Sequence, residues 1–261
     1  MSDIQASDPA EQGSYVYSVI RCGEPRTFGP IGIGAPGSPV RTVHYGELAA
    51  VVSDAPLTPY DPTRENLLAH QRVNETVMSE FTVLPLAFGA QFRSEADVVE
   101  ILRNTHDSLL DVLRKMDGKV EFDLKVFWDP QRVLAEIQEQ NELVRHLRSQ
   151  MGSGQESGYL SHLQLGQIVQ DAMRQRAESY VREVYSALED TAVASRTNAT
   201  IGEDMILNAA FLINRTEEGS FNQMLDRIAA EFEGRLSFRL SGPFPPYNFV
   251  RIRLSVGEAP E

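Results

Sequence analysis

The amino-acid sequence predicts an α+β protein of two domains. With 261 residues, the chain exceeds the about 100 to 200 residues of a typical domain, which favours two domains over one. Strand-like alternation is mixed with stretches whose apolar residues recur at helical spacing. From residue 119 to 241 the order is strand, helix, strand, strand, helix, strand, which is typical of a ferredoxin-like domain. We therefore expect an N-terminal mixed α/β domain over 15–117 and a C-terminal modified ferredoxin-like domain (βαββαβ) over 118–256.

The first domain is expected to open with a strand at Tyr15–Ile20, followed by a loop rich in glycine and proline to residue 39. Residues 40–53 (VRTVHYGELAAVVS) predict a hairpin that turns at Tyr45-Gly46. A helix follows residues 61–63 (DPT), which supply capping oxygens. Its apolar face carries Leu67, Val77, Met78 and Phe81.

Two polar residues, His70 and Asn74, lie one turn apart on this apolar face. A buried polar pair needs hydrogen-bond partners, at a cost of about 1 to 3 kcal/mol for each group left without one. Because no acid, base or nucleophile accompanies the pair in the sequence, we expect it to be a buried, structurally satisfied pair rather than a catalytic one.

The stretch from Leu84 to Phe92, LPLAFGAQF, concentrates apolar side chains around one proline and one glycine. A strand over 82–86 would place Leu84 and Leu86 on one face, with Phe88 and Phe92 on either side of Gly89. The stretch is either a core strand with its turn or a surface that a partner covers. We take Leu84, Leu86, Phe88 and Phe92 as protein-binding candidates, with Phe88 the best of them, because a helix in a groove or an added strand could dock there.

One long helix is expected next, capped by Ser94-x-x-Asp97 and running to Met116. In the second domain, alternation over 120–126 predicts a strand with one solvated face. The later elements are a charged helix from residue 130 to 148, a flexible hinge near 149–158, and a second helix to about 188. Two strands near 191–196 and 205–214 come next, followed by a helix around 221–232 and a strand at 236–240. A final strand at 249–254 (FVRIRL) could extend the sheet.

Composition excludes several classes of function. The net charge of −13 disfavours a surface that follows nucleic-acid phosphates. No stretch approaches the roughly 18 to 20 apolar residues that span a bilayer, and residues 1–14 lack the pattern of a secretory leader, so we expect no secretion. The single cysteine, Cys22, and five histidines without metal-binding spacing predict no metal site, no cofactor and no catalytic group. We expect a cytoplasmic protein that binds neither nucleic acid nor membrane.

The glycine-rich loop at 32–37 (GIGAPG) matches the dinucleotide fingerprint G-x-G-x-x-G in its letters. That fingerprint works where the glycines lead from a strand into a helix whose amino terminus holds the pyrophosphate. Here prolines and a strand follow, so we interpret the stretch as an ordinary loop.

Several blocks of the chain together resemble the gas vesicle protein L/F family. They are YVYSVI, VHYGELAAVVSDAP, ENLLAHQRVNETVM, VLPLAFGAQFRSEADVVEIL, GKVEFDLKVFWD and LSGPFPPYNFV. The similarity extends in order from Tyr15 to about Leu254. It implies an accessory protein of gas vesicle formation, located at the gas vesicle or in the cytoplasm, without catalysis, whose partners are the major shell protein and other accessory proteins. It also implies a modified ferredoxin-like C-terminal domain.

Three functions stay open at this point. The first is a non-enzymatic adaptor that binds the hydrophobic shell protein and assists nucleation or assembly, and the second is a minor structural component retained in the shell. The third is a small-molecule enzyme on a ferredoxin-like domain, since a fold does not determine a function. A pocket with His70 at its floor and a shifted pKa would favour the enzyme.

Overall fold

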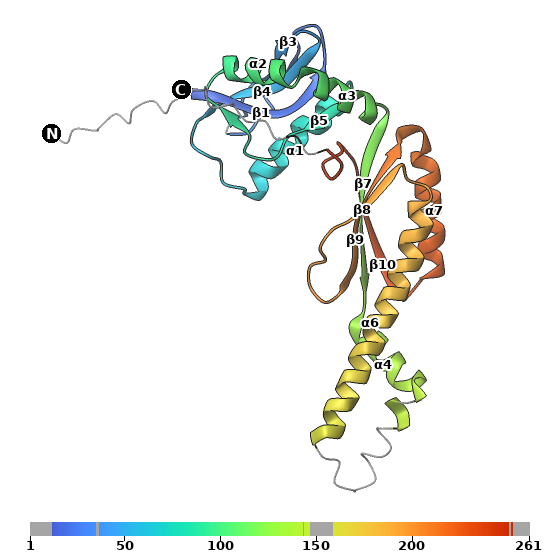
Figure 1. Cartoon of the computed structure of the whole chain (residues 1–261). Coiled ribbons are helices and arrows are strands. Elements are labelled where there is room, and N and C mark those ends of the chain that lie inside the picture. Colours follow the sequence, from blue (N-terminus) through green and yellow to red (C-terminus); the bar gives the residue numbers. More distant parts are fainter. Residues whose placement is uncertain (1–11, 35–36, 143, 147–158, 251, 253–261) are drawn as a thin grey trace, which may run out of the picture. The chain divides into compact units, whose positions relative to one another are not determined.

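The computed structural model describes residues 12–34, 37–142, 144–146, 159–250 and 252. The chain divides into two compact units, each with its own sheet (Figure 1). The first unit combines the residues up to Glu121 with those from Pro243 onward, and the second comprises Phe122–Gly242. The fold is α+β, as the sequence predicts.

Strands and helices alternate irregularly along the chain. The strands are β1 (Gln12–Arg21), β2 (Thr27–Gly29), β3 (Val40–Tyr45), β4 (Leu48–Pro56), β5 (Val83–Pro85), β6 (Gln91–Phe92), β7 (Lys119–Trp128), β8 (Ala194–Thr197), β9 (Met205–Asn214) and β10 (Leu236–Phe244). The helices are α1 (Arg64–Met78), α2 (Glu95–Asn104), α3 (His106–Met116), α4 (Pro130–Gln140), α6 (Tyr159–Glu189), the 3-10 turn η1 (Arg215–Glu217) and α7 (Glu218–Glu231). The short strands β2 and β6 are absent from the sequence-based expectation, because two or three residues carry no measurable alternation.

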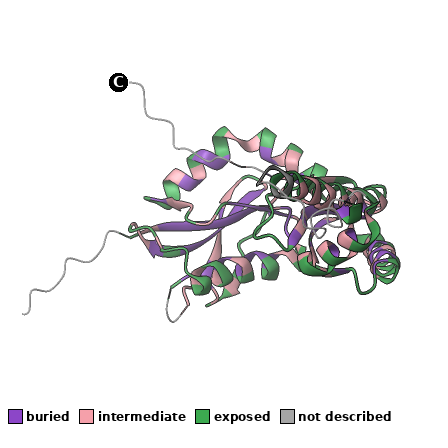
Figure 2. Ribbon diagram, turned by 90° about the horizontal axis from the view of Figure 1, so that it is seen from below, coloured by how far each residue is buried: buried purple, intermediate pink, exposed green. Residues whose placement is uncertain are grey.

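The first sheet has the order β2-β3-β4-β1-β5, and β6 also pairs with β1. Its pairs are antiparallel, including the expected β3–β4 hairpin, where Gly46 has φ +58° in the turn. The central strands β1 and β4 are almost wholly buried, so they lack a solvated face. Figure 2 shows such buried strands between helices whose outer faces are exposed.

Helices cover both faces of this sheet. On one face Val16 and Val19 of β1 pack with Leu102 of α2 and Leu113 of α3. On the other face Tyr15, Tyr17 and Ile20 of β1 lie in a second cluster of buried side chains, together with Val73 and Val77 of α1. A register shift in β1 between Val16 and Ser18 sets which side chains face each layer. The first unit therefore has two cores, one on each side of a single sheet.

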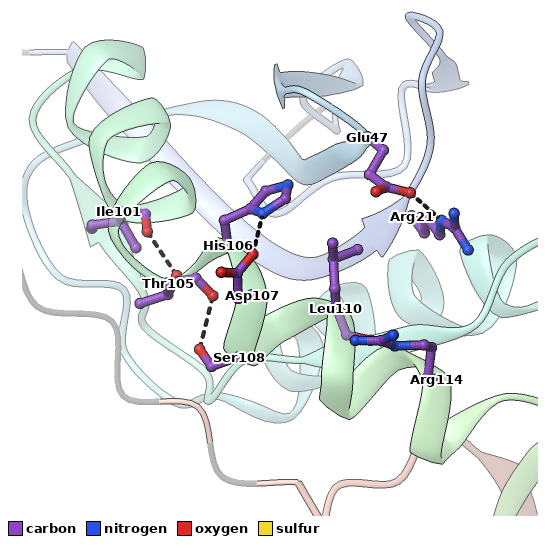
Figure 3. Close-up of polar contacts among 9 residues, drawn as sticks. All are labelled: Arg21, Glu47, Ile101, Thr105, His106, Asp107, Ser108, Leu110 and Arg114. Carbon is purple, nitrogen blue, oxygen red and sulfur yellow. Dashed lines mark hydrogen bonds and ion pairs between the residues drawn. The ribbon is translucent and has the colours of Figure 1, made fainter.

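The long helix expected up to Met116 is two helices, which meet at Thr105 (Figure 3). Thr105 leaves helical geometry (φ −113°, ψ 8°), and its hydroxyl donates to the carbonyl of Ile101 at 2.7 Å. When the hydroxyl of a threonine hydrogen-bonds to a carbonyl of the preceding turn, it competes with the backbone hydrogen bonds of the helix and bends the helix. The carbonyl of Thr105 in turn accepts a bond from the Ser108 hydroxyl at 2.8 Å, at the start of α3.

The second sheet has the order β10-β7-β9-β8. Its elements follow the order β7, α4, α6, β8, β9, α7, β10, and β8 pairs with β9 in antiparallel register. The rings of Phe122 on β7 and Phe211 on β9 lie 5.7 and 5.5 Å from that of Phe221 on α7. Tyr185 of α6 also contacts Phe211. Helices therefore cover the sheet face that holds the even-numbered residues of β7 and the odd-numbered residues of β9.

The charged helix expected from 130 to 148 ends earlier, at Gln140. It begins where the Asp129 carboxylate accepts bonds from the backbone amides of Gln131 and Arg132. At its end Asn141 becomes extended, and its side chain accepts from the amide of Val144 at 3.2 Å, so a new helical stretch starts there. The hinge near 149–158 lies outside the described residues.

The last described residues pack in the first unit, although the sequence places them in a C-terminal domain of 118–256. Val250 is buried in the first unit's core. The expected strand at 249–254 is not formed at Phe249 and Val250, and residue 251 and those from 253 on lie outside the described residues. Two prolines, Pro245 and Pro246, turn the chain just after β10, and the amide of Val250 donates to the carbonyl of Pro246.

Candidate partner-binding site

The apolar stretch from Leu84 to Phe92 pairs with β1 at both ends. Leu84 in β5 lies opposite Val19, and Phe92 in β6 lies opposite Ser14. Leu84 is 0 %, Leu86 3 % and Phe92 9 % exposed. These three side chains face the core formed with α2 and α3, because antiparallel pairing with a central strand places them under those helices. The structure therefore places three of the four protein-binding candidates in the interior.

Phe88 is the fourth candidate, and it is partly exposed. It lies in the loop between β5 and β6 and packs against the other core, on the opposite side of the sheet from Leu84. Its ring centroid is 6.2 Å from that of Tyr15 and 6.0 Å from that of His70, both in edge-on geometry. Gly89 follows with φ +90°, a conformation that favours glycine. Phe88 thus has one side in contact with the interior and one side toward solvent.

His70 and Asn74 are buried, at 5 % and 0 % exposure. Nδ1 of His70 is 3.0 Å from the hydroxyl of Tyr15, and its Nε2 is 3.2 Å from Nδ2 of Asn74. The amide of Asn74 also donates to the hydroxyl of Tyr247 at 3.0 Å. The hydroxyl of Tyr15 accepts a bond from the backbone amide of Gly89 at 3.0 Å. This buried polar network, Tyr15–His70–Asn74–Tyr247, links β1, α1, the Phe88 loop and the C-terminal segment.

Burial determines the proton affinities in the network. It lowers the pKa of His70 to about 4, against the opposing effect of a hydrogen bond to the backbone of Leu86. Burial also raises the pKa of Tyr15, and it raises the pKa of Tyr247 to about 12. At neutral pH the network is therefore uncharged. His70 has the shifted pKa that an enzyme would require, but both of its ring nitrogens contact core side chains rather than a reactive group.

A second buried polar contact holds the C-terminal segment. The carboxylate of Glu121, 1 % exposed, accepts bonds from the backbone amide of Asn248 at 2.8 Å and from its side-chain amide at 2.7 Å. Sequence reasoning missed Tyr15, Tyr247 and Glu121 in these roles. In the sequence, Glu121 is one of the polar residues that alternate with apolar residues in a strand with one solvated face. Nothing in the local pattern indicates that a distant segment of the chain covers its side chain.

The glycine-rich loop is held by its own hydrogen bonds. The amide of Gly32 donates to the carbonyl of Ser38 at 2.9 Å, and the amide of Ile33 donates to the hydroxyl of Tyr17 at 2.7 Å. Ile33 is fully buried, and the chain continues into β3 rather than into a helix. These two amides are therefore engaged within the protein, which agrees with the loop interpretation and not with a phosphate-binding turn.

Three cavities lie apart from the candidate residues. One of about 350 Å³ lies between the glycine-rich loop and α1, where Leu68 and Arg72 line it. A second of about 360 Å³ lies between Phe81 and Arg114, and a third of about 450 Å³ lies between α4 and α6. None of the three is lined by His70. Within the described ranges no group of three or more His, Cys, Asp or Glu side chains could hold a metal ion, and no helix there is long and apolar enough to cross a bilayer.

These observations define a two-unit α+β protein in which a partly exposed phenylalanine lies above a buried, uncharged polar network. The match to known proteins is specific. Residues 13–251 match the family model "Gas vesicle synthesis protein GvpL/GvpF", and the chain belongs to this family. The resemblance found in the sequence is thus confirmed.

Individual relatives come from both branches of the family. Gas vesicle protein F of Streptomyces sp. (strain CB03234) is 32 % identical over 91 % of this chain and 99 % of its own length. Gas vesicle protein L of the same strain is 29 % identical over 91 % of this chain and 92 % of its own.

Solved structures are also similar. The crystal structure of the gas vesicle protein GvpF from Anabaena sp. PCC7120 has a TM-score of 0.82 and 28 % identity, over 93 % of this chain and 99 % of that one. The GvpF structure from Microcystis aeruginosa has a TM-score of 0.76 and 27 % identity, over 92 % of this chain and 99 % of that chain.

Proposed function

We propose that this protein is a non-enzymatic accessory protein of gas vesicle formation that binds the hydrophobic major shell protein and assists its nucleation or assembly. Membership of the gas vesicle synthesis family carries the proposal. The second unit, with its strand order β10-β7-β9-β8, serves in this proposal as a modified ferredoxin-like domain.

Phe88 is the contact that we assign to the shell protein. Of the four candidates it alone reaches solvent, and its loop is held by the bond from the Gly89 amide to Tyr15. On α1, Leu67 is 43 % exposed and lies one turn before His70, whose ring contacts Phe88. Phe88 thus presents an aromatic side chain that packs on the buried rings of Tyr15 and His70, and Leu67 adds an exposed apolar side chain on α1, which suits an apolar helix or strand of a partner. Leu84, Leu86 and Phe92 lie in the core on the other face of the sheet, so this proposal assigns no contact with the partner to them.

The physical benefit of such an adaptor is protection from aggregation. A shell protein that excludes water from one face of its assembly exposes that apolar face before it is incorporated. A partner with a net charge of −13 keeps the pair dispersed by repulsion while it covers the apolar face. Other accessory proteins of the same assembly are further partners in this proposal.

Co-purification tests this function. The chain is expressed together with the major gas vesicle shell protein, as wild type, as Phe88→Asp and as Ile201→Asp. Ile201 is 73 % exposed in the second unit and provides the matched control. We expect wild type and Ile201→Asp to retain the shell protein, and Phe88→Asp to lose it because a carboxylate cannot be buried against an apolar partner.

Circular dichroism of each purified variant establishes that it is folded. If a folded Phe88→Asp variant retains the shell protein, Phe88 is not part of the binding surface. If wild type and both variants all fail to retain the shell protein, direct binding is contradicted. Washing intact vesicles separates the two roles, since an adaptor is removed while a structural component of the shell stays bound.

A further inference from the structure

The segment 245–250, which we call the C-terminal strap, is fixed in the first unit by two polar contacts. The hydroxyl of Tyr247 accepts a hydrogen bond from the side chain of Asn74 on α1 at 3.0 Å. The next residue, Asn248, donates from its backbone and side-chain amides to the buried carboxylate of Glu121. The last residue of the strap is buried in the core formed with α2 and α3. The strap therefore contacts α1 and also the core on the other face of the sheet.

A continuous series of contacts leads from the strap to the loop that carries Phe88. The amide nitrogen of Asn74 that donates to the strap also lies 3.2 Å from Nε2 of His70. Nδ1 of the same ring is 3.0 Å from the hydroxyl of Tyr15, which accepts a bond from the backbone amide of Gly89. Phe88 itself packs edge-on against the rings of His70 and Tyr15. The strap and the loop are thus joined through α1 and β1.

The side chain of Asn74 is the least satisfied member of this series. It is fully buried, and its oxygen has no hydrogen-bond partner among the described residues. Its orientation therefore depends on the two contacts of its nitrogen, one with the strap and one with His70. A buried amide that loses one of these contacts is free to rotate and to turn its oxygen toward a new donor. Such a rotation would break the contact with His70, whose ring supports Phe88.

We propose that Tyr247 is a positioning residue for the Phe88 contact, and that it acts through Asn74. The orientation of this amide holds the His70 ring, against which Phe88 packs. The inference rests on the proposed function, in which Phe88 binds the shell protein. A side chain whose orientation is fixed before binding avoids an ordering cost that corresponds to about a two- to tenfold difference in affinity.

Amide hydrogen exchange of the full chain, followed by NMR, tests the coupling without any partner. Tyr247→Phe removes one hydroxyl and leaves the ring in place. We expect the Gly89 amide to exchange about tenfold faster in this variant, because the loop opens more often. The amide of Cys22, which bonds to the carbonyl of Glu47 in the same unit, should keep its wild-type rate. Acceleration of both amides by one factor would mean that the whole unit is destabilised, which contradicts a positioning role.

A matched control and a double variant separate the series of contacts from a general loss of stability. Tyr185→Phe also removes a bonded hydroxyl, 2.7 Å from that of Ser195 in the second unit, and should leave the Gly89 rate unchanged. Tyr15→Phe removes the acceptor of the Gly89 amide itself. In that background Tyr247→Phe should have no further effect on Gly89, since the series is already broken. If the effects of the two substitutions multiply, the two hydroxyls act independently and the proposal is wrong.

Asn248→Ala repeats the test from the other polar contact of the strap, in case Tyr247→Phe fails to fold. It removes the side-chain donor to Glu121 and leaves the hydroxyls of the network in place. We expect faster exchange at Gly89 here as well, because the strap is loosened while the network is chemically intact. An unchanged Gly89 rate in the folded variants would overturn the proposal.

Competition for the shell protein tests the consequence for binding. Wild type and Tyr247→Phe, which carry different affinity tags, are expressed together with a limiting amount of the major shell protein. We expect the variant to retain about two- to tenfold less shell protein than wild type, and Tyr185→Phe to retain an equal amount. Equal retention by Tyr247→Phe would show that its hydroxyl does not serve the contact. If wild type retains none, the proposed function fails, whereas the exchange rates still decide whether Tyr247 positions the loop of Phe88.

Discussion

At the scale of single residues, His70 shows how a polar side chain is tolerated in an apolar core. The ring is 5 % exposed, and its nitrogens contact the Tyr15 hydroxyl and the Asn74 amide. Hydrogen bonding to neutral partners satisfies the neutral imidazole but offers a proton no counter-charge. The sequence correctly indicates a pair on the apolar face of a helix, but it cannot name Tyr15 or Tyr247 as partners.

The titration of His70 predicts a loss of stability in acid. The folded-state pKa is about 4 and the ordinary value is 6.5, so below pH 6.5 the unfolded chain binds a proton that the folded chain does not. The stabilisation is therefore complete above pH 6.5 and is lost as the pH falls toward 4, up to about 3 kcal/mol. Urea unfolding followed by near-ultraviolet circular dichroism of the tyrosines, at steps from pH 7 to pH 4.5, measures it.

His70→Gln provides the comparison, because glutamine can still hydrogen-bond but does not titrate. Carboxylates titrate in both proteins, so the difference between the two pH profiles isolates the histidine. We expect the wild-type free energy of unfolding to fall more steeply between pH 6.5 and pH 4.5 than that of His70→Gln. Parallel profiles would show that the ring is not kept neutral by burial.

At the scale of elements, loops and breaks depend on particular backbone positions. Gly37 has φ +105°, and a Cβ there would lie 2.4 Å from the carbonyl oxygen of Pro30. The glycine-rich loop closes through this contact and through the bond from Gly32 to Ser38. Its glycines are therefore explained by the packing of the loop on itself. The break at Thr105 is another case in which a single side chain ends an element that periodicity alone would continue.

Replacing Gly37 by alanine should destabilise the first unit by about 1 to 3 kcal/mol, since both the backbone angle and the close carbonyl oppose a side chain. Gly23→Ala is the matched control, because no heavy atom lies within 4 Å of its Cβ position. Thermal unfolding of both variants gives the comparison. An unchanged melting temperature for Gly37→Ala would mean that the loop relaxes without cost.

At the scale of the whole molecule, the two units have separate cores. The first has a sheet with helices on both faces, and in the second α6 and α7 cover one face of the sheet. The only tryptophan of the chain, Trp128, lies in the second unit, where its indole donates to the carbonyl of Glu203 at 3.0 Å. Its fluorescence therefore reports on the second unit.

Phe211→Ala should lower the stability of the second unit by about 3 to 5 kcal/mol, since it removes a fully buried ring that contacts Phe221 and Tyr185. We expect an earlier tryptophan transition in urea and unchanged hydrogen-exchange protection of β1 in native buffer. Val19→Ala, in the core of the first unit, should give the opposite pattern. Equal loss of protection in β1 for both variants would show that the units unfold together.

The sequence by itself determined the α+β class, the family and most element positions, because alternation, helical periodicity, caps and turn glycines act between residues close in the chain. Only the tertiary structure decided which apolar residues of LPLAFGAQF stay at the surface, which partners His70 and the side-chain nitrogen of Asn74 contact while the Asn74 oxygen has none among the described residues, and where the C-terminal segment packs. Those outcomes rest on hydrogen bonds between residues 55, 127 and 173 positions apart. No local pattern specifies such pairs, because they form only when folding brings distant segments together.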